Sequence, residues 1–272
     1  MNFKKIEWIF LIAFIVLDIF LFTTYLRQND GTQYSSDMNG TNTTSTILKN
    51  IRNDQIHYGK LSNKTAAGFY VAVPDSHHLR REATQLRDQS WSYNDGILRS
   101  SFSTGIKISD SDKPEKTLNT VVKDKNMIIH GSKYKYYKKL STDDMVVYTQ
   151  TMFGRPVLSK MGQIRFYING DYVESYSQGY ISQASTLREE QETISQQRAL
   201  LWLYQYKKIT SNSTILWSQL GYSRLLQANG NTIYMPTWNF GIRNNNSDNI
   251  QYRRINAFTG AVFNGMGDSS AQ

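Results

Sequence analysis

The sequence predicts an α+β protein in which one N-terminal transmembrane helix is followed by an extracytoplasmic domain of antiparallel sheets packed with helices. Three observations support this fold class. An apolar run lies near the N-terminus, several later segments have apolar residues at helical spacing, and other segments alternate aromatic or branched residues with polar ones. The exterior is expected either as one body or as two similar α/β layers joined near residue 181.

The apolar run has the length of a membrane span. Residues 8–26 comprise 19 positions, 13 of them Val, Ile, Leu or Phe, and a transmembrane helix needs about 20 residues. Together the 13 favour insertion by about 4–8 kcal/mol. Asp18, near the middle, costs about 2.5–3.5 kcal/mol on the same scale. The segment is therefore expected to insert despite its carboxyl group.

A cleavable signal peptide is the alternative for this segment. Its apolar core would span about 7–15 residues and end in a small-x-small site, whereas this run is longer and "TTYLRQNDG" follows it. An uncleaved anchor is favoured. Lys4 and Lys5 precede the run and only Arg27 closely follows it, so the positive-inside rule places the N-terminus in the cytoplasm. The chain is expected at the cell membrane, crossing it once, with its C-terminal domain outside the cell.

The expected organisation has six parts. Composition changes along the chain, including a stretch rich in Ser, Thr, Asn and Gly after the apolar run, set the boundaries. The parts are a cytoplasmic tail (1–7), the transmembrane helix (8–26), a flexible linker (27–46), an α+β subdomain (47–180), a second, PepSY-like α+β subdomain (181–265) and a tail (266–272).

The first subdomain is expected to begin with a helix near residues 47–51, followed by a short buried strand over 67–73. A second helix has Asp75 as its expected N-cap, and Asn94-Asp95-Gly96 supplies a hairpin turn. A third helix starts near residue 117. From 133 to 181 the pattern is that of half-exposed strands, which predicts an antiparallel sheet.

The second subdomain repeats this order, with a helix inside residues 185–209 and four strands after it. Glu189, Glu190 and Glu192 are expected in the first turns of that helix, where carboxylates interact favourably with its dipole. This structural role explains the acidic cluster without catalysis.

The composition excludes several kinds of chemistry. The chain has no cysteine, which excludes disulfides, thiol nucleophiles and thiolate metal sites. Its four histidines lack the spacing of a zinc motif, and the adjacent His77 and His78 are interpreted as a surface pair. The net charge is +9, but the basic residues are spread out, so a solvated surface, anionic lipid or wall polymer fits better than nucleic acid. No cofactor, metal or small-molecule substrate is predicted.

Asp18 is the remaining candidate for a functional residue. On a helix, residues three, four and seven positions away share its face, and here they form an apolar stripe without a small-xxx-small pattern. Two interpretations are open. A protonated Asp18 hydrogen-bonds to a polar group of a partner helix, or it is a lone acid that the favourable insertion tolerates. The first defines a partner-binding site made of Asp18, Leu11, Phe14, Ile15, Leu21, Phe22 and Tyr25.

Several short motifs resemble those of one family. They are the N-terminal "LDIFL" run, Tyr148-Thr149-Gln150 before Gly154-Arg155-Pro156, "YVESYSQGYI", Gly221-Tyr222, "YMPTW" and "INAFTG". In this order the motifs resemble the YycI (WalI) family over nearly the whole chain. The last is also similar to the acid-Ala-x-Thr-Gly turn of PepSY modules, with Asn256 in place of the acid.

The resemblance implies a non-enzymatic accessory protein of the Yyc/Wal two-component system, which controls cell-wall metabolism in low-GC Gram-positive bacteria. With a YycH-type partner, such proteins contact the sensor histidine kinase (YycG/WalK type), largely through transmembrane helices, and restrain it. No catalytic residue carries over. The alternatives are a membrane-anchored binding module for wall polymer or peptide and, less supported by the motifs, an envelope enzyme.

Overall fold

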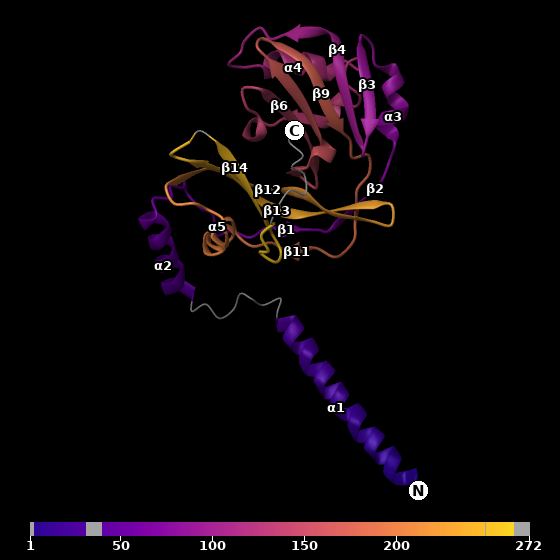
Figure 1. The fold of residues 1–272 in the computed structure, drawn as a ribbon, viewed down its shortest axis with the longest axis vertical. Coiled ribbons are helices and arrows are strands. Elements are labelled where there is room, and N and C mark those ends of the chain that lie inside the picture. The colour runs from indigo at the N-terminus through magenta and orange to yellow at the C-terminus, as the bar shows by residue number, and fades with distance from the viewer. Residues whose placement is uncertain (1–2, 31–39, 248, 264–272) are drawn as a thin grey trace. The chain divides into compact units, whose positions relative to one another are not determined.

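The computed structural model describes residues 3–30, 40–247 and 249–263. The chain forms two units, Met1–Asn50 and Ile51–Gln272. The described part of the second unit contains two larger antiparallel sheets, a two-stranded antiparallel pair and few helices (Figure 1). The predicted α+β class with antiparallel sheets is therefore confirmed.

The first unit is helical. Helix α1 covers Phe3–Asp30, and α2 covers Gly40–Asn53 and continues into the second unit. Helix α2 contains the helix predicted near residues 47–51 and starts inside the predicted linker, whose residues 31–39 lie outside the described residues. Among the described residues, no helix combines the length and apolar character of a membrane span. The transmembrane helix predicted over 8–26 is therefore not confirmed.

The larger sheet has seven strands in the order β3-β4-β9-β8-β6-β5, with β7 paired to β6. All of its pairings are antiparallel. Helices α3 (His78–Glu82) and α4 (Glu115–Lys123) contribute buried residues to the core of this larger sheet. The strands are β3 (Gln89–Asn94), β4 (Ile97–Lys107), β5 (Tyr134–Tyr136), β6 (Met145–Met152), β7 (Arg155–Pro156), β8 (Gln163–Asn169) and β9 (Tyr172–Gly179).

The predicted hairpin turn between β3 and β4 is confirmed. Asp95 and Gly96 have φ values of 52° and 77°, the left-handed conformation that a two-residue type I′ turn requires at both positions. Asn94 therefore pairs with Ile97 directly beside the turn. The local turn chemistry thus fixes the register of the whole hairpin.

The smaller sheet has five strands in the order β10-β2-β13-β12, with β14 paired to β13. A separate pair joins β1 (Ala67–Gly68) to β11 (Gln191–Glu192), and α5 covers Gln196–Gln205. The strands of the sheet are β2 (Val71–Pro74), β10 (Ser185–Thr186), β12 (Ser213–Ala228), β13 (Asn231–Asn244) and β14 (Ile250–Asn256).

The chain enters this smaller sheet twice. Strand β2 comes early in the sequence, yet it pairs with the start of β13, with Val71 opposite Tyr234. The predicted subdomain boundary between residues 180 and 181 stays a prediction, and this pairing links segments on its two sides. The last of the four strands predicted after the helix within residues 185–209 was expected over residues 260–265. Within its described residues it forms only an isolated bridge between Ile255 and Val262.

The main core lies on one face of the larger sheet. Tyr148, Phe166 and Tyr176 are at most 1% exposed, and α4 packs Leu118 and Val121 against the same cluster. Burial of aromatic side chains contributes much of the stability of such a core. A second cluster, which includes Val157 and Tyr222, spans the two sheets.

Two local predictions are wrong. Asp75 is not an N-cap, because α3 is preceded by His77 and has no side-chain cap. Asp75 instead accepts hydrogen bonds from Gln227 Nε2 (2.6 Å) and Thr232 Oγ1 (3.2 Å).

The glutamates also lie outside the helix. Glu192 is in β11, and α5 begins only at Gln196. The N–H of Thr193 donates to the Ala66 carbonyl at 2.7 Å, which keeps this segment extended. The actual cap is Ser195, whose Oγ accepts from the Arg198 N–H at 3.2 Å.

Candidate partner-binding site

Between residues 11 and 22, helix α1 presents apolar side chains on all sides. Its described large apolar side chains are exposed, from 49% for Ile15 to 66% for Trp8. They occupy nearly every position from 11 to 22, and at 3.6 residues per turn such a run covers the whole circumference.

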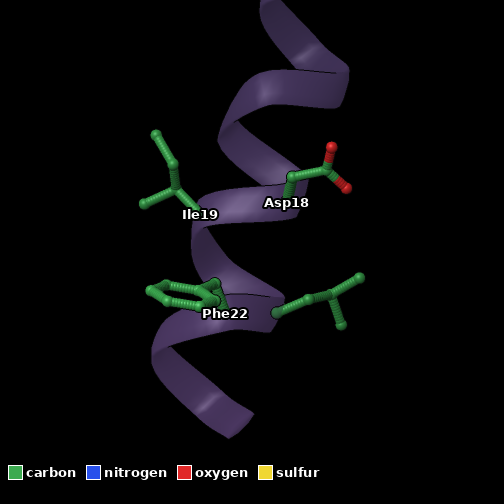
Figure 2. Close-up of a pocket in the computed structure, with 4 residues that line it drawn as sticks. Asp18, Ile19 and Phe22 are labelled. Atoms are coloured by element: carbon green, nitrogen blue, oxygen red, sulfur yellow. The ribbon is translucent and has the colours of Figure 1, made fainter. Parts of the chain in front are cut away.

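Asp18 interrupts this apolar surface. It lines a shallow depression on α1 together with Ile19, Leu21 and Phe22, and Figure 2 shows its carboxylate projecting outward from the helix, with Ile19 and Phe22 directed elsewhere. No hydrogen bond or ion pair to the carboxylate is formed within the described part of the chain. The acid is therefore available to a group from another molecule.

The structure brings part of the predicted set together. Asp18, Leu21 and Phe22 share the depression, while Leu11, Phe14 and Ile15 lie one to two turns earlier on the same helix, exposed like the others. The side chain of Tyr25 is outside the described residues. Partner binding by this stripe stays a prediction. Selecting residues three, four and seven positions from Asp18 missed Ile19, because the depression extends sideways around the helix rather than along one face.

A second candidate site is a groove in the unit Ile51–Gln272. It has a volume of about 710 Å³, within the size range of ligand pockets. Its lining comes from both sheets and includes the cations Arg80 and Arg224 and the rings of Tyr93, Tyr180 and Tyr234. Arg80 and Arg224 are far apart in the sequence, so no local motif could have predicted this site.

The histidines have separate neighbours. The ring of His77 lies 6.1 Å from that of Tyr93, edge-on, and His78 Nδ1 lies 3.1 Å from Arg81 Nη2. His130 Nε2 is 3.0 Å from Glu82 Oε2. No group of three or more potential metal ligands occurs among the described residues.

Burial shifts the pKa of several side chains in the unit Ile51–Gln272. It raises the pKa of Tyr137 to about 12, and the hydroxyl of this residue is buried without a hydrogen-bond partner in the described chain. Burial also lowers the pKa of Lys139, whose Nζ donates to Gln219 Oε1 at 2.8 Å. Tyr137 and Lys139 thus contribute to packing and hydrogen bonding within the fold.

The structure thus defines a mixed α+β protein with two antiparallel sheets and an exposed apolar helix at its N-terminus. The model of the YycI protein family matches residues 35–258 of the 272. The chain belongs to the YycI family, whose members are accessory regulators of the Yyc/Wal two-component system. The resemblance predicted from the motifs is confirmed.

Solved structures offer more distant similarities. An uncharacterized protein from Eubacterium rectale is 10% identical, with 77% of this chain and 89% of that chain covered and a TM-score of 0.43. The YpeB C-terminal domain of Bacillus megaterium is 12% identical, with 84% and 95% covered and a TM-score of 0.35. No curated protein matches the sequence. At these TM-scores the two structures carry no argument about function.

Proposed function

We propose that this chain is a non-enzymatic, membrane-anchored regulator that binds the sensor histidine kinase of its two-component system and restrains it, together with a YycH-type partner. The observation that carries the proposal is α1, whose apolar side chains are exposed on all sides around one unpartnered carboxylate. The family membership supplies the regulatory context.

The bilayer is the environment that suits this helix. By the insertion scale, its apolar residues outweigh the cost of Asp18 by roughly 1–5 kcal/mol. Lys4 and Lys5 support the proposed cytoplasmic N-terminus, and in that orientation the sheets lie outside the cell. In lipid, Asp18 is a strong candidate for a hydrogen bond to a polar group on a kinase helix, because water does not compete there.

Regulation requires that the helix distinguish two states of the kinase. A bound protein shifts a conformational equilibrium only by the difference between its affinities for the two states. A hydrogen bond from Asp18 that forms in one state alone supplies such a difference. Its expected size is about 0.6–2 kcal/mol, or roughly a 3- to 30-fold change in the equilibrium.

The test is Asp18→Leu in the full-length chain. Association with the kinase, followed by copurification from membranes, should fall about 3- to 30-fold, and kinase output should rise. Asp18→Asn keeps a hydrogen-bonding group and should retain most association. Val16→Leu, two residues away and so on another face of α1, is the matched control and should change nothing. Unchanged association and unchanged output for Asp18→Leu would defeat the role of Asp18.

The groove supports one alternative, a membrane-anchored module that binds wall polymer or peptide. Its arginines and tyrosine rings are suited to a polar or anionic ligand. Replacing residues 1–27 by an unrelated membrane anchor separates the two functions. Loss of kinase regulation favours α1, whereas retained regulation favours the exterior.

A further inference from the structure

The two edges of the larger sheet differ in how they are protected. At one edge, β5 has only three residues and contains Lys135, with further lysines on both sides of it. At the other edge, β3 has six residues, Gln89–Asn94, without a charge or a proline. Short strands and lysines are the usual protection of a sheet edge against added strands. Strand β3 lacks both.

The backbone of β3 has free hydrogen-bonding groups. Ser103 N–H donates to the Asp88 carbonyl at 2.8 Å, which shows that the even-numbered residues of this hairpin bond across to β4. The N–H and C=O groups of Trp91 and Tyr93 therefore point away from the sheet. The described residues provide no backbone partner for the N–H groups of these two residues.

The edge is also open to solvent. Ser90, Trp91 and Ser92 are all exposed, so α3, which lies next to β3 in Figure 1, leaves them uncovered. Trp91 ends a row of paired residues that continues inward through Ser100, Tyr176 and Phe166. The inner members are at most 3% exposed, whereas Trp91 is 37% exposed. The Trp91 ring therefore lacks a neighbouring strand on its outer side, and one additional strand would cover it.

On the other face of the sheet from Trp91, Arg99 indicates that a suitable partner is negatively charged. Ser92 pairs with Arg99, whose exposed side chain has no hydrogen bond or ion pair within the described chain. A carboxylate opposite Ser92 on an added strand would share a cross-strand row with Arg99, with only the small Ser92 between them. The two backbones would be about 10 Å apart, a separation that the long Arg99 and glutamate side chains can span together. A second copy of β3 brings no carboxylate to this position, because the strand is uncharged.

We propose that β3 binds an extended segment of another protein as an additional strand. The segment has apolar residues on the face that meets Trp91 and acidic residues on the face that meets Arg99. Backbone hydrogen bonds provide affinity in this mode of recognition, and the alternate side chains provide specificity. The site lies on the exterior and does not depend on the function proposed for α1.

The experiment uses the full-length chain in detergent and two labelled, end-blocked synthetic octapeptides, one alternating valine with glutamate and one alternating valine with lysine. Binding is followed by fluorescence anisotropy. The glutamate peptide should bind at least 10-fold more tightly than the lysine peptide. Arg99→Gln should reduce this preference, whereas the control Arg243→Gln, an exposed arginine in the smaller sheet, should leave it unchanged.

Two further variants test the edge itself. Trp91→Pro removes an outward N–H that the fold does not use, and it should weaken binding at least 10-fold, with Trp91→Val weakening it less. Because proline can disturb folding, Ser92→Glu is the second variant. It should weaken the glutamate peptide alone, and Ser177→Glu, on the same face of the inner strand β9, should weaken it less.

Three results would overturn the proposal. They are an equal affinity of both peptides, unchanged affinity for Trp91→Pro and Ser92→Glu, or dimerisation of the chain through β3 in sedimentation without peptide binding.

Discussion

Gly260 closes the "INAFTG" turn, and replacing it by alanine is expected to destabilise the smaller sheet. Its φ is 69°, and its N–H donates to the Asn256 carbonyl at 2.9 Å. Asn256 Oδ1 in turn accepts the N–H groups of Phe258 (2.8 Å) and Thr259 (3.2 Å). A Cβ at Gly260 would overlap the six-membered ring of Trp202 on α5. The glycine is therefore required for both conformation and packing.

The size of the effect follows from a comparison with Gly154. Gly154 has a similar φ of 75°, but nothing lies within 4 Å of a Cβ built on it. Left-handed backbone costs an alanine about 1–2 kcal/mol, and the stiffer unfolded chain returns about 0.4–1 kcal/mol. Gly154→Ala should therefore cost about 1 kcal/mol. Gly260→Ala adds overpacking of about 1–3 kcal/mol against Trp202, for a total of about 2–4 kcal/mol.

The assay is urea denaturation of each variant, followed by tryptophan fluorescence and by circular dichroism. Gly260→Ala should lower the midpoint clearly more than Gly154→Ala. In a Trp202→Ala background the additional cost should disappear, since the overlapping ring is gone. Equal losses for the two glycine variants, or an additional cost that persists without the Trp202 ring, would refute the reasoning.

Two further predictions concern the unit Ile51–Gln272. Ser195→Ala removes the cap of α5 and should cost about 1 kcal/mol in urea denaturation, while Ser195→Asp should retain stability; no loss for the alanine variant would contradict the capping role. Burial holds the pKa of Tyr137 at about 12, above the unfolded value of about 10. The folded chain thus keeps a proton that the unfolded chain releases, so this contribution is present below pH ~10 and declines as pH rises toward ~12. Tyr137→Phe should make denaturation midpoints fall less steeply over that range, and an unchanged slope would argue against the shift.

Local turn chemistry made much of the fold predictable. Asn94-Asp95-Gly96 fixes a hairpin because only left-handed backbone at two adjacent positions matches the twist of its strands. The alternation between residues 133 and 181 likewise predicted the antiparallel strands of the larger sheet. In both places the determining residues are neighbours in the sequence.

Long-range pairing was not predictable in the same way. The sequence correctly predicted a buried strand at β2, but no residue near Val71 indicates that Val71 lies opposite Tyr234. The expected helix after Asp75 is also shorter than predicted, since Leu79, Ala83 and Leu86 have the spacing of one helical face. Helix α3 ends at Glu82, and Asp88, with a φ of 55°, turns the chain into β3. The hairpin pairing of β3 with β4 overrides helical propensity in this segment.

The candidate sites likewise differ in whether their residues are close together or far apart in the sequence. The stripe around Asp18 could be derived from helical periodicity alone, because its members lie within a few turns of one another. The groove between Arg80 and Arg224 and the open edge at Trp91 depend on which strands become neighbours. Free backbone groups at a sheet edge leave no trace in residue composition beyond the missing lysines and prolines.

Separate units make the functional experiments interpretable. Helix α1 belongs to the unit Met1–Asn50, and the sheets belong to Ile51–Gln272. Asp18 makes no hydrogen bond within the described chain, so Asp18→Leu should leave the denaturation midpoint of the unit Ile51–Gln272 unchanged. Under the function proposed for α1, a change in kinase output with an unchanged midpoint is the result expected from altered association through the helix. Gly260→Ala changes the stability of the unit Ile51–Gln272 and leaves α1 unaltered. Any change in kinase output for this variant must then arise from the lower stability of that unit. Together the two variants separate contact by α1 from contact by the sheets.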